Sequence, residues 1–107
     1  MTDSLTRASL AYAAWRGDEA EVARLLAAGA NVHYRDDCAL YLAARQGHDA
    51  VVARLLAAGA DVHARDGVAV KAADFEGHDV VVARLIAAGA NKDLVLFAAA
   101  DNHAVFE

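Results

Sequence analysis

The stretch Val22–Ala30, with the sequence VARLLAAGA, returns unchanged at residues 52–60 and again at residues 82–90 with only Leu26 replaced, by Ile86. The interval is thirty residues both times. A fixed period of this size is typical of stacked supersecondary units, each of which buries its apolar face only against its neighbours. The repeat therefore predicts a solenoid, an architecture that mostly provides binding surfaces.

Signals within each period predict two helices. We expect the first helix at residues 5–15, 37–45 and 67–75, and the second at residues 19–28, 49–58 and 79–88. The turns between the two helices are marked by Gly17, Gly47 and Gly77. The second helices are expected to stop at Gly29, Gly59 and Gly89, because glycine readily takes the left-handed conformation that ends a helix.

The second helix carries one apolar stripe, because Val22, Leu25 and Leu26 are spaced i, i+3 and i+4. Carboxylates at or near the helix starts can cap free backbone N–H groups. They belong to Asp18, Asp49 and Asp79.

The last unit of the chain is incomplete. Residues 92–100 align with residues 36–44, but only residues 104–107 remain after the next turn, too few for a second helix. There is no proline and no Ser/Gly-rich linker. We therefore expect one domain over residues 1–107, with repeats at about 5–35, 36–65 and 66–92 and a partial capping unit at 93–107.

A dense motif fills the second repeat. It reads Leu40-x-x-Ala43-Ala44-x-x-Gly47-His48-x-x-Val51-Val52-x-x-Leu55-Leu56-x-x-Gly59-Ala60-Asp61-Val62. This pattern resembles the ankyrin repeat, and the third repeat follows it from Val70 to Asn91. The resemblance covers residues 5 to about 103. It implies an all-α ankyrin-type solenoid of three helix-turn-helix repeats plus a truncated C-terminal helix.

The repeats are shorter than the roughly 33 residues typical of this family. The shortened segments are residues 36–39, Asp-Asp-Cys-Ala, and residues 66–69, Asp-Gly-Val-Ala. They are similar to the 30-residue version seen in some bacterial and viral ankyrin proteins. That resemblance implies shortened hairpin loops, or fingers, in place of long β-hairpins.

The resemblance also implies which residues meet a protein partner. In ankyrin proteins, the residues after the paired alanines line the concave groove, and the fingers lie beside it. The corresponding groove residues here are Trp15, Arg16, Arg45, Gln46, Phe75 and Glu76. The finger positions are residues 34–37 and 64–67, among them Tyr34, Arg35 and Arg65. Trp, Tyr and Arg often dominate interface energetics. Alternatively, Trp15 and Phe75 fill gaps between helices.

The histidines occupy equivalent positions in successive repeats, as the pairs His33/His63 and His48/His78. Stacked helices lie about 8–10 Å apart, whereas nitrogen ligands lie about 2.0–2.1 Å from zinc. Equivalent histidines therefore cannot share one ion, and we expect no metal and no cofactor. The resemblance implies that the Gly-His pair is structural, its imidazole bonding the backbone of a neighbouring loop.

Cys38, with Asp36, Asp37 and His48, has the residue types of a nucleophile and its base. The alternative is a small, half-buried side chain near the start of a packed helix. The sequence has no Gly-rich phosphate loop and no nucleophile elbow. We expect no catalytic site, and rapid thiol labelling near neutral pH would favour the enzyme alternative.

One arginine per repeat forms a column on the second helices: Arg24, Arg54 and Arg84. Such a column can meet an acidic partner. We favour the alternative, in which the aliphatic stems cover alanine-rich surface and the charged heads stay solvated.

The C-terminal segment is apolar. Its apolar side chains include Leu94, Val95, Leu96, Phe97, Val105 and Phe106. Terminal units of repeat arrays normally have a polar outer face, and exposed apolar patches mark contact surfaces. We expect this end of the chain to self-associate, as a homodimer through the C-terminal helix, or to dock a partner. The alternative is that residues 104–107 fold back over the patch.

The net charge of −5 argues against binding to nucleic acid or anionic membranes. The longest apolar runs have seven residues, against about 20 for a membrane-spanning helix. Without an export signal, and with Cys38 as the one cysteine, the chain is expected to be cytoplasmic.

The expected function is non-catalytic protein binding. The alternative is a small stoichiometric inhibitor, such as an immunity or anti-defence protein of a bacterium or phage.

Overall fold

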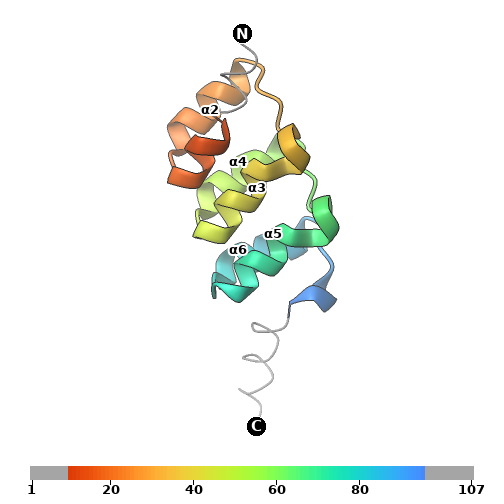
Figure 1. Ribbon diagram of the computed structural model, residues 1–107. Coiled ribbons are helices and arrows are strands. Elements are labelled where there is room, and N and C mark those ends of the chain that lie inside the picture. Colours follow the sequence, from red (N-terminus) through yellow and green to blue (C-terminus); the bar gives the residue numbers. More distant parts are fainter. Residues whose placement is uncertain (1–9, 96–107) are drawn as a thin grey trace.

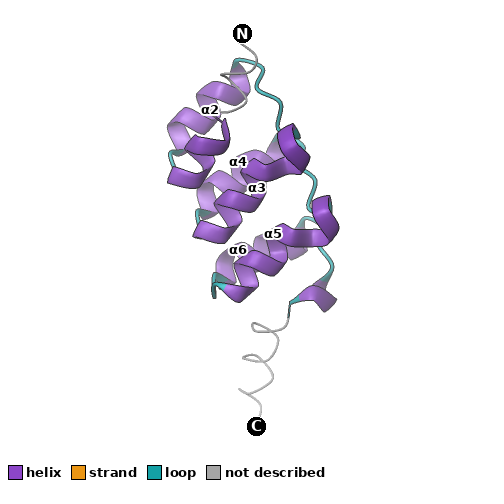
Figure 2. Cartoon of the chain, viewed as in Figure 1, coloured by secondary structure: helices purple, strands orange, loops and turns teal. Residues whose placement is uncertain are grey.

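The computed structural model describes residues 10–95. Within that range the regular structure is helical and includes no strand. After a helix at residues 10–16 come α2 (Glu19–Ala27), α3 (Tyr34–Gln46), α4 (Asp49–Ala57), α5 (Ala64–Phe75), α6 (Asp79–Ala87) and the short 3₁₀ helix η1 (Lys92–Leu94). Short turns join the helices (Figure 2). The expected second helices are confirmed, and each ends one residue earlier than expected.

The helix pairs stand side by side in one row (Figure 1). The first helices, residues 10–16, α3 and α5, form one layer, and the second helices, α2, α4 and α6, form the other. Helix α3 packs against α5, and α4 packs against both α2 and α6. This arrangement is the predicted solenoid and not a closed bundle.

The core repeats with the sequence. The same positions of successive units are buried, as in the sets Leu10/Leu40/Val70, Ala13/Ala43/Ala73, Val22/Val52/Val82, Leu25/Leu55/Leu85 and Val32/Val62. The alanines bring the first helices close to their partners, while the branched side chains fill the space between layers. Burying the second-helix stripe explains why these short helices form, since isolated helices of this length are marginal in water.

A left-handed turn precedes the right-handed part of α3 and of α5. In α3 it consists of Arg35, Asp36 and Asp37, with φ of 52°, 55° and 60°. In α5 it consists of Arg65, Asp66 and Gly67, with φ of 52°, 58° and 78°. Each non-glycine residue in this conformation costs about 1–2 kcal/mol, so contacts to the rest of the stack must hold the turns in place. These turns are the shortened fingers, and we did not predict their left-handed geometry.

Ion pairs connect successive second helices. Arg54 Nε lies 3.0 Å from Glu19 Oε2, and Arg84 reaches both carboxylate oxygens of Asp49, at 2.6 and 2.8 Å. Arg24 pairs within its own helix, with Glu21. The preferred interpretation of the arginine column was therefore incomplete, because the heads are exposed but ion-paired.

Capping at the second helices also differs from the expectation. The Asp18 carboxylate accepts a hydrogen bond from the backbone N–H of Glu21 and caps α2. The N-cap residues of α4 and α6 are His48 and His78, and neither makes a side-chain cap. Asp49 is instead the first residue of α4, where it pairs with Arg84.

Replacing Arg84 by glutamine is expected to raise the pKa of Asp49 toward its ordinary value. Hydrogen bonds from Arg84, and then its charge, hold that pKa low in the folded chain. The pair therefore stabilises the fold above the unfolded pKa of aspartate, about 3.9, and the contribution is lost as pH falls through the lower folded pKa. Because the pair is partly exposed, the accompanying loss of stability at neutral pH should be small.

An NMR titration of the Asp49 carboxyl carbon measures this shift directly. Lys71→Gln is the matched control, since it removes an exposed cation on α5. A pKa of Asp49 that is equal in wild type and Arg84→Gln would show that the pair does not form in solution.

Candidate functional site

The exposed side of residues 10–16, α3 and α5, here called the first-helix surface, carries the groove residues expected from the sequence. In each unit two buried residues are followed by two exposed residues; the buried pair is two alanines in the first two units and Ala73-Asp74 in the third. The exposed pairs are Trp15/Arg16, Arg45/Gln46 and Phe75/Glu76. Since the units are stacked in one row, the three pairs lie at equivalent places along the same face.

Two aromatic side chains on this surface are exposed to an unusual degree. Trp15 is 46% exposed and Phe75 is 71% exposed. These fractions do not agree with the alternative in which both side chains fill gaps between helices. Large exposed aromatic groups on a rigid face are instead typical of interface anchors.

Tyr12 belongs to the same surface, and the sequence analysis missed it. It is 58% exposed, and its ring stacks on that of Trp15 with the centroids 6.0 Å apart. The Arg16 guanidinium lies 5.5 Å from the Tyr12 ring centroid, a cation–π distance. The i, i+3 spacing of Tyr12 and Trp15 on one helix could have revealed the pair.

His48 and His78 hold the ends of the first helices through hydrogen bonds to the backbone. His48 Nε2 lies 2.9 Å from the carbonyl oxygen of Trp15, and His78 Nε2 lies 3.0 Å from that of Arg45. Since a carbonyl only accepts, Nε2–H donates in both bonds. The structural role implied for the Gly-His pair is confirmed. Each bond connects the end of one first helix to the following repeat of the stack.

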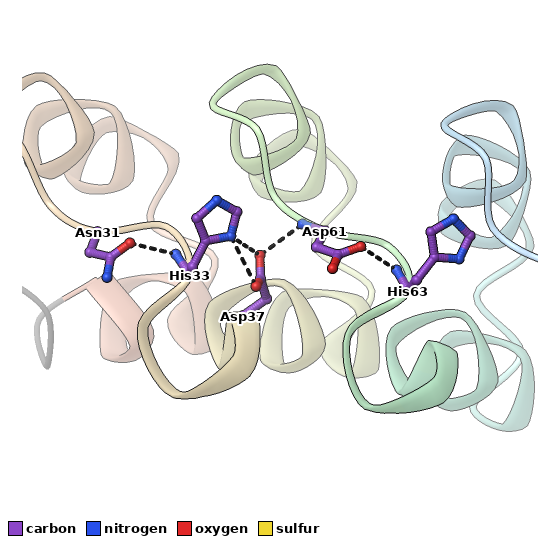
Figure 3. A network of polar contacts seen from close by, with 5 residues as sticks. All are labelled: Asn31, His33, Asp37, Asp61 and His63. Atoms are coloured by element: carbon purple, nitrogen blue, oxygen red, sulfur yellow. Dashed lines mark hydrogen bonds and ion pairs between the residues drawn. The ribbon is translucent and has the colours of Figure 1, made fainter.

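A second network holds the fingers (Figure 3). The carboxylate of Asp37 is 5% exposed, accepts a hydrogen bond of 2.8 Å from the N–H of Asp61, and lies 3.1 Å from His33 Nδ1. Asn31 and Asp61 each accept, through a side-chain oxygen, from the backbone N–H two residues later. The network links the loop before α3 to the loop before α5.

Two expected finger positions are therefore not surface positions. Asp37 is buried in the network, and Gly67 is buried where a Cβ would lie 2.6 Å from Leu94 Cδ1. The exposed part of each finger is Arg35-Asp36 and Arg65-Asp66. Tyr34 is half-buried.

The finger arginines are held in place by neighbours. Arg35 lies over the Tyr34 ring, 5.6 Å from its centroid, and its Nε donates a 3.2 Å hydrogen bond to the Tyr34 hydroxyl. Arg65 Nε lies 3.5 Å from Asp36 Oδ2, which joins the two fingers. The fingers thus present two cations from adjacent repeats.

A pocket of about 340 Å³ opens between the starts of α3 and α5. Its lining residues are Arg35, Asp36, Cys38, Tyr41, Leu42, Arg65 and Val68. Burial raises the pKa of the half-buried Cys38 thiol, and the charges of Arg35 and Arg65 offset this only in part. A raised pKa is the opposite of what an activated thiolate needs. The sequence analysis did not predict Tyr41, Leu42 or Val68 as site residues.

The residues expected to self-associate are only partly described. Leu94 is partly buried against the core and Val95 is 5% exposed. The segment Lys92–Leu94 is a 3₁₀ helix. The remaining residues of that prediction, Leu96, Phe97, Val105 and Phe106, lie outside the described residues.

Comparison with known proteins supplies the family. The family model described as ankyrin repeats (3 copies) matches residues 2–66, more than half of the chain. No curated protein matches the sequence. Between residues 10 and 95, no helix is long and apolar enough to cross a membrane, and no group of His, Cys, Asp and Glu side chains could hold a metal ion. With its stacked helix pairs and its Gly-His contacts, the chain belongs to the ankyrin repeat family, whose members are generally protein–protein interaction modules and typically non-catalytic.

Proposed function

We propose that this chain binds a protein partner through the first-helix surface, with Trp15 and Phe75 as anchors at its two ends. The observation that carries the proposal is the exposure of large aromatic side chains on this face, namely Tyr12, Trp15 and Phe75. The residues between them, Arg45 and Gln46, are exposed and polar. Aromatic anchors with a polar surround are the usual composition of a protein interface.

The proposed mechanism is rigid presentation. Tyr12 and Trp15 are stacked on one another, and the carbonyl of Trp15 is fixed by His48 of the next repeat. The backbone carbonyl of Arg45 is held in the same way by His78. Because the stacked rings and the helix ends are ordered before contact, less conformational entropy is lost when the partner binds.

The charge distribution favours an acidic partner surface. The first-helix surface and the fingers expose the cations Arg16, Arg35, Arg45, Arg65 and Lys71. The exposed carboxylates there belong to Asp36, Asp66 and Glu76. The exposed side chains of this region are therefore net positive in a chain whose formal charge is −5, while the buried carboxylates of Asp37 and Asp74 lie in the same helices. Complementary charge steers a partner to the correct face and raises the association rate.

The double variant Trp15→Ala/Phe75→Ala tests the assignment. Both side chains are exposed, so the far-UV circular dichroism spectrum should not change, while the affinity for the partner should fall at least tenfold, about 1.4 kcal/mol. The partner is first captured from the source cell with the wild-type chain and identified by mass spectrometry. Its affinity for each variant is then measured by isothermal titration calorimetry.

Val80→Ala is the matched control, because Val80 is an exposed apolar side chain, 66% accessible, on the second helix α6. It should bind like wild type. If Val80→Ala weakens binding and the double variant does not, the partner uses the second-helix face and the proposal is wrong.

The alternatives from the sequence differ in their support. Nothing in the geometry of Cys38 favours an enzyme, since burial raises its pKa. A stoichiometric inhibitor would use the same first-helix surface, and the identity of the captured partner separates it from an adaptor. A cytoplasmic location remains our proposal, on the ground that a single cysteine suits a reducing compartment.

A further inference from the structure

The pocket between the fingers is lined by two cations, the Asp36 carboxylate and several apolar side chains. Arg35 and Arg65 occupy the same position in adjacent repeats, thirty residues apart, and both line the pocket. Leu42, Val68 and the half-buried Cys38 supply the apolar part of its lining. Its volume of about 340 Å³ falls at the low end of the range for ligand sites, roughly 300–1,000 Å³.

Neither cation is firmly neutralised. The distance of 3.5 Å from Arg65 Nε to Asp36 Oδ2 exceeds the roughly 2.7–2.9 Å of a strong charge-assisted hydrogen bond. Arg35 donates its Nε–H to a neutral phenol, that of Tyr34, which adds no negative charge. Both guanidinium groups also act electrostatically on the Cys38 sulfur, so their positive potential reaches into the pocket, where the carboxylates of Asp36 and Asp37 oppose it in part.

This arrangement is confined to one junction of the stack. In the sequence, Leu5 and Ala8 stand at the positions of the first repeat that correspond to Arg35 and Cys38. The paired arginines therefore arise only where the second and third repeats meet. A site at one junction can select for a specific feature of the partner, whereas a repeated site could not fix its register.

We propose that this pocket binds a carboxylate carried on an apolar stem, presented by the protein partner. The carboxylate is held by Arg35 and Arg65, and the stem contacts Leu42, Val68 and Cys38. The proposal rests on the proposed function, because it assigns the chemistry of one partner group that docks beside the first-helix surface. A free organic acid of the same chemistry would occupy the same place, and the test separates the two.

The electrostatic potential in the pocket can be measured through Cys38, because it is the only cysteine of the chain. Iodoacetate and iodoacetamide alkylate the same thiolate and differ chiefly in charge. In the ratio of the iodoacetate rate constant to the iodoacetamide rate constant, the thiolate fraction cancels. This ratio, here called the alkylation ratio, therefore reports the local electrostatic potential. The reference is the same chain unfolded in urea. We expect the ratio to be roughly three- to tenfold higher in the folded chain, from Coulomb attraction by two nearby cations.

Arg35→Gln and Arg65→Gln should each lower this ratio by about half or more, while circular dichroism confirms that the helices remain. Arg45→Gln is the matched control, since Arg45 is exposed on the same face but does not line the pocket. A folded ratio no higher than that of the unfolded chain overturns the proposal. An equal fall in Arg45→Gln also overturns it, because the potential would then belong to the whole face.

The stem is tested with N-acetyl-L-leucine and its uncharged amide as probes. At tens of millimolar, as the weak affinity of small ligands requires, N-acetyl-L-leucine should slow alkylation of Cys38 by iodoacetamide about twofold, and the amide should not. Equal protection by both probes, or none by either, overturns the carboxylate assignment.

Experiments with the partner show whether the carboxylate comes from the partner or from a free organic acid. Saturating partner should protect Cys38 in the wild-type chain, and Arg35→Gln should weaken partner binding. Protection by N-acetyl-L-leucine without protection by the partner would mean a free organic acid and overturn the partner assignment. If Trp15→Ala/Phe75→Ala leaves the partner affinity unchanged while the alkylation ratio is high, the proposed function fails and the pocket chemistry stands. If Trp15→Ala/Phe75→Ala weakens partner binding while the alkylation ratio of the folded chain is not raised, the proposed function stands and the pocket chemistry fails.

Discussion

Replacing Leu55 by alanine is expected to lower the free energy of unfolding by about 2–5 kcal/mol. Leu55 is fully buried in α4, the middle second helix, which packs against both α2 and α6. The loss combines the transfer energy of the removed methyl groups with the cavity they leave. Because a domain of this size is stable by roughly 5–15 kcal/mol, the variant loses a large fraction of its stability.

Urea unfolding followed by far-UV circular dichroism measures the effect as a lower midpoint. Leu56→Ala is the matched control, since Leu56 is the next residue of the same helix and is only partly buried. It should cost roughly half as much or less. Equal losses in the two variants would contradict the helix orientation described here. A changed m-value would show that the stack no longer unfolds as one unit, as expected when the middle repeat of a solenoid weakens.

Replacing Gly47 by alanine is expected to cost about 3 kcal/mol. Gly47 has φ of +78°, where a side chain is strained by about 1 kcal/mol or more. A Cβ there would also lie 2.6 Å from His78 Nδ1 and 2.7 Å from its Cε1, so the ring must move. Moving it breaks the hydrogen bond from His78 to the carbonyl of Arg45, worth about 1 kcal/mol, and loosens the contact between repeats.

Gly59→Ala separates the two causes. Gly59 also has positive φ, +97°, but no described atom lies within 4 Å of a Cβ built there. It should lose only the backbone part, about 1 kcal/mol. In a His78→Ala background, Gly47→Ala should cost no more than Gly59→Ala does, since the clash is gone. A cost for Gly47→Ala that persists in full in that background would contradict the Gly-His contact.

The predictable part of this fold is the part that each repeat contains within itself. The apolar stripe of Val22 and Leu25 predicted the second helices to within one residue at their ends. One contact between repeats was also expected: the family resemblance of the Gly-His pair implied the bond from His48 to the backbone of the preceding repeat. The family resemblance implied that Trp15 and Phe75 lie on the groove, and both are exposed, but Tyr12, which stacks on Trp15, was missed.

Features that span two repeats were harder to predict. Asp37 has the residue type of a surface finger, and only the loop of the next repeat, at Asp61, explains its burial. The left-handed turn at Arg35 contradicts the ordinary preference of its residue type. The ion pair from Arg84 to Asp49 joins residues 35 positions apart, a separation longer than the thirty-residue period.

From the sequence alone come the thirty-residue unit, its two helices, its glycine corners and the apolar stripe of its second helix, because short-range periodicity and chain stiffness suffice to define one unit. The tertiary structure decided what lies between units: the network around Asp37, the cross-repeat ion pairs and the pocket shared by Arg35 and Arg65. A repeated sequence specifies identical units but not the rotation and translation between neighbours. Those depend on how two packed surfaces fit together, and they determine which side chains of adjacent repeats meet.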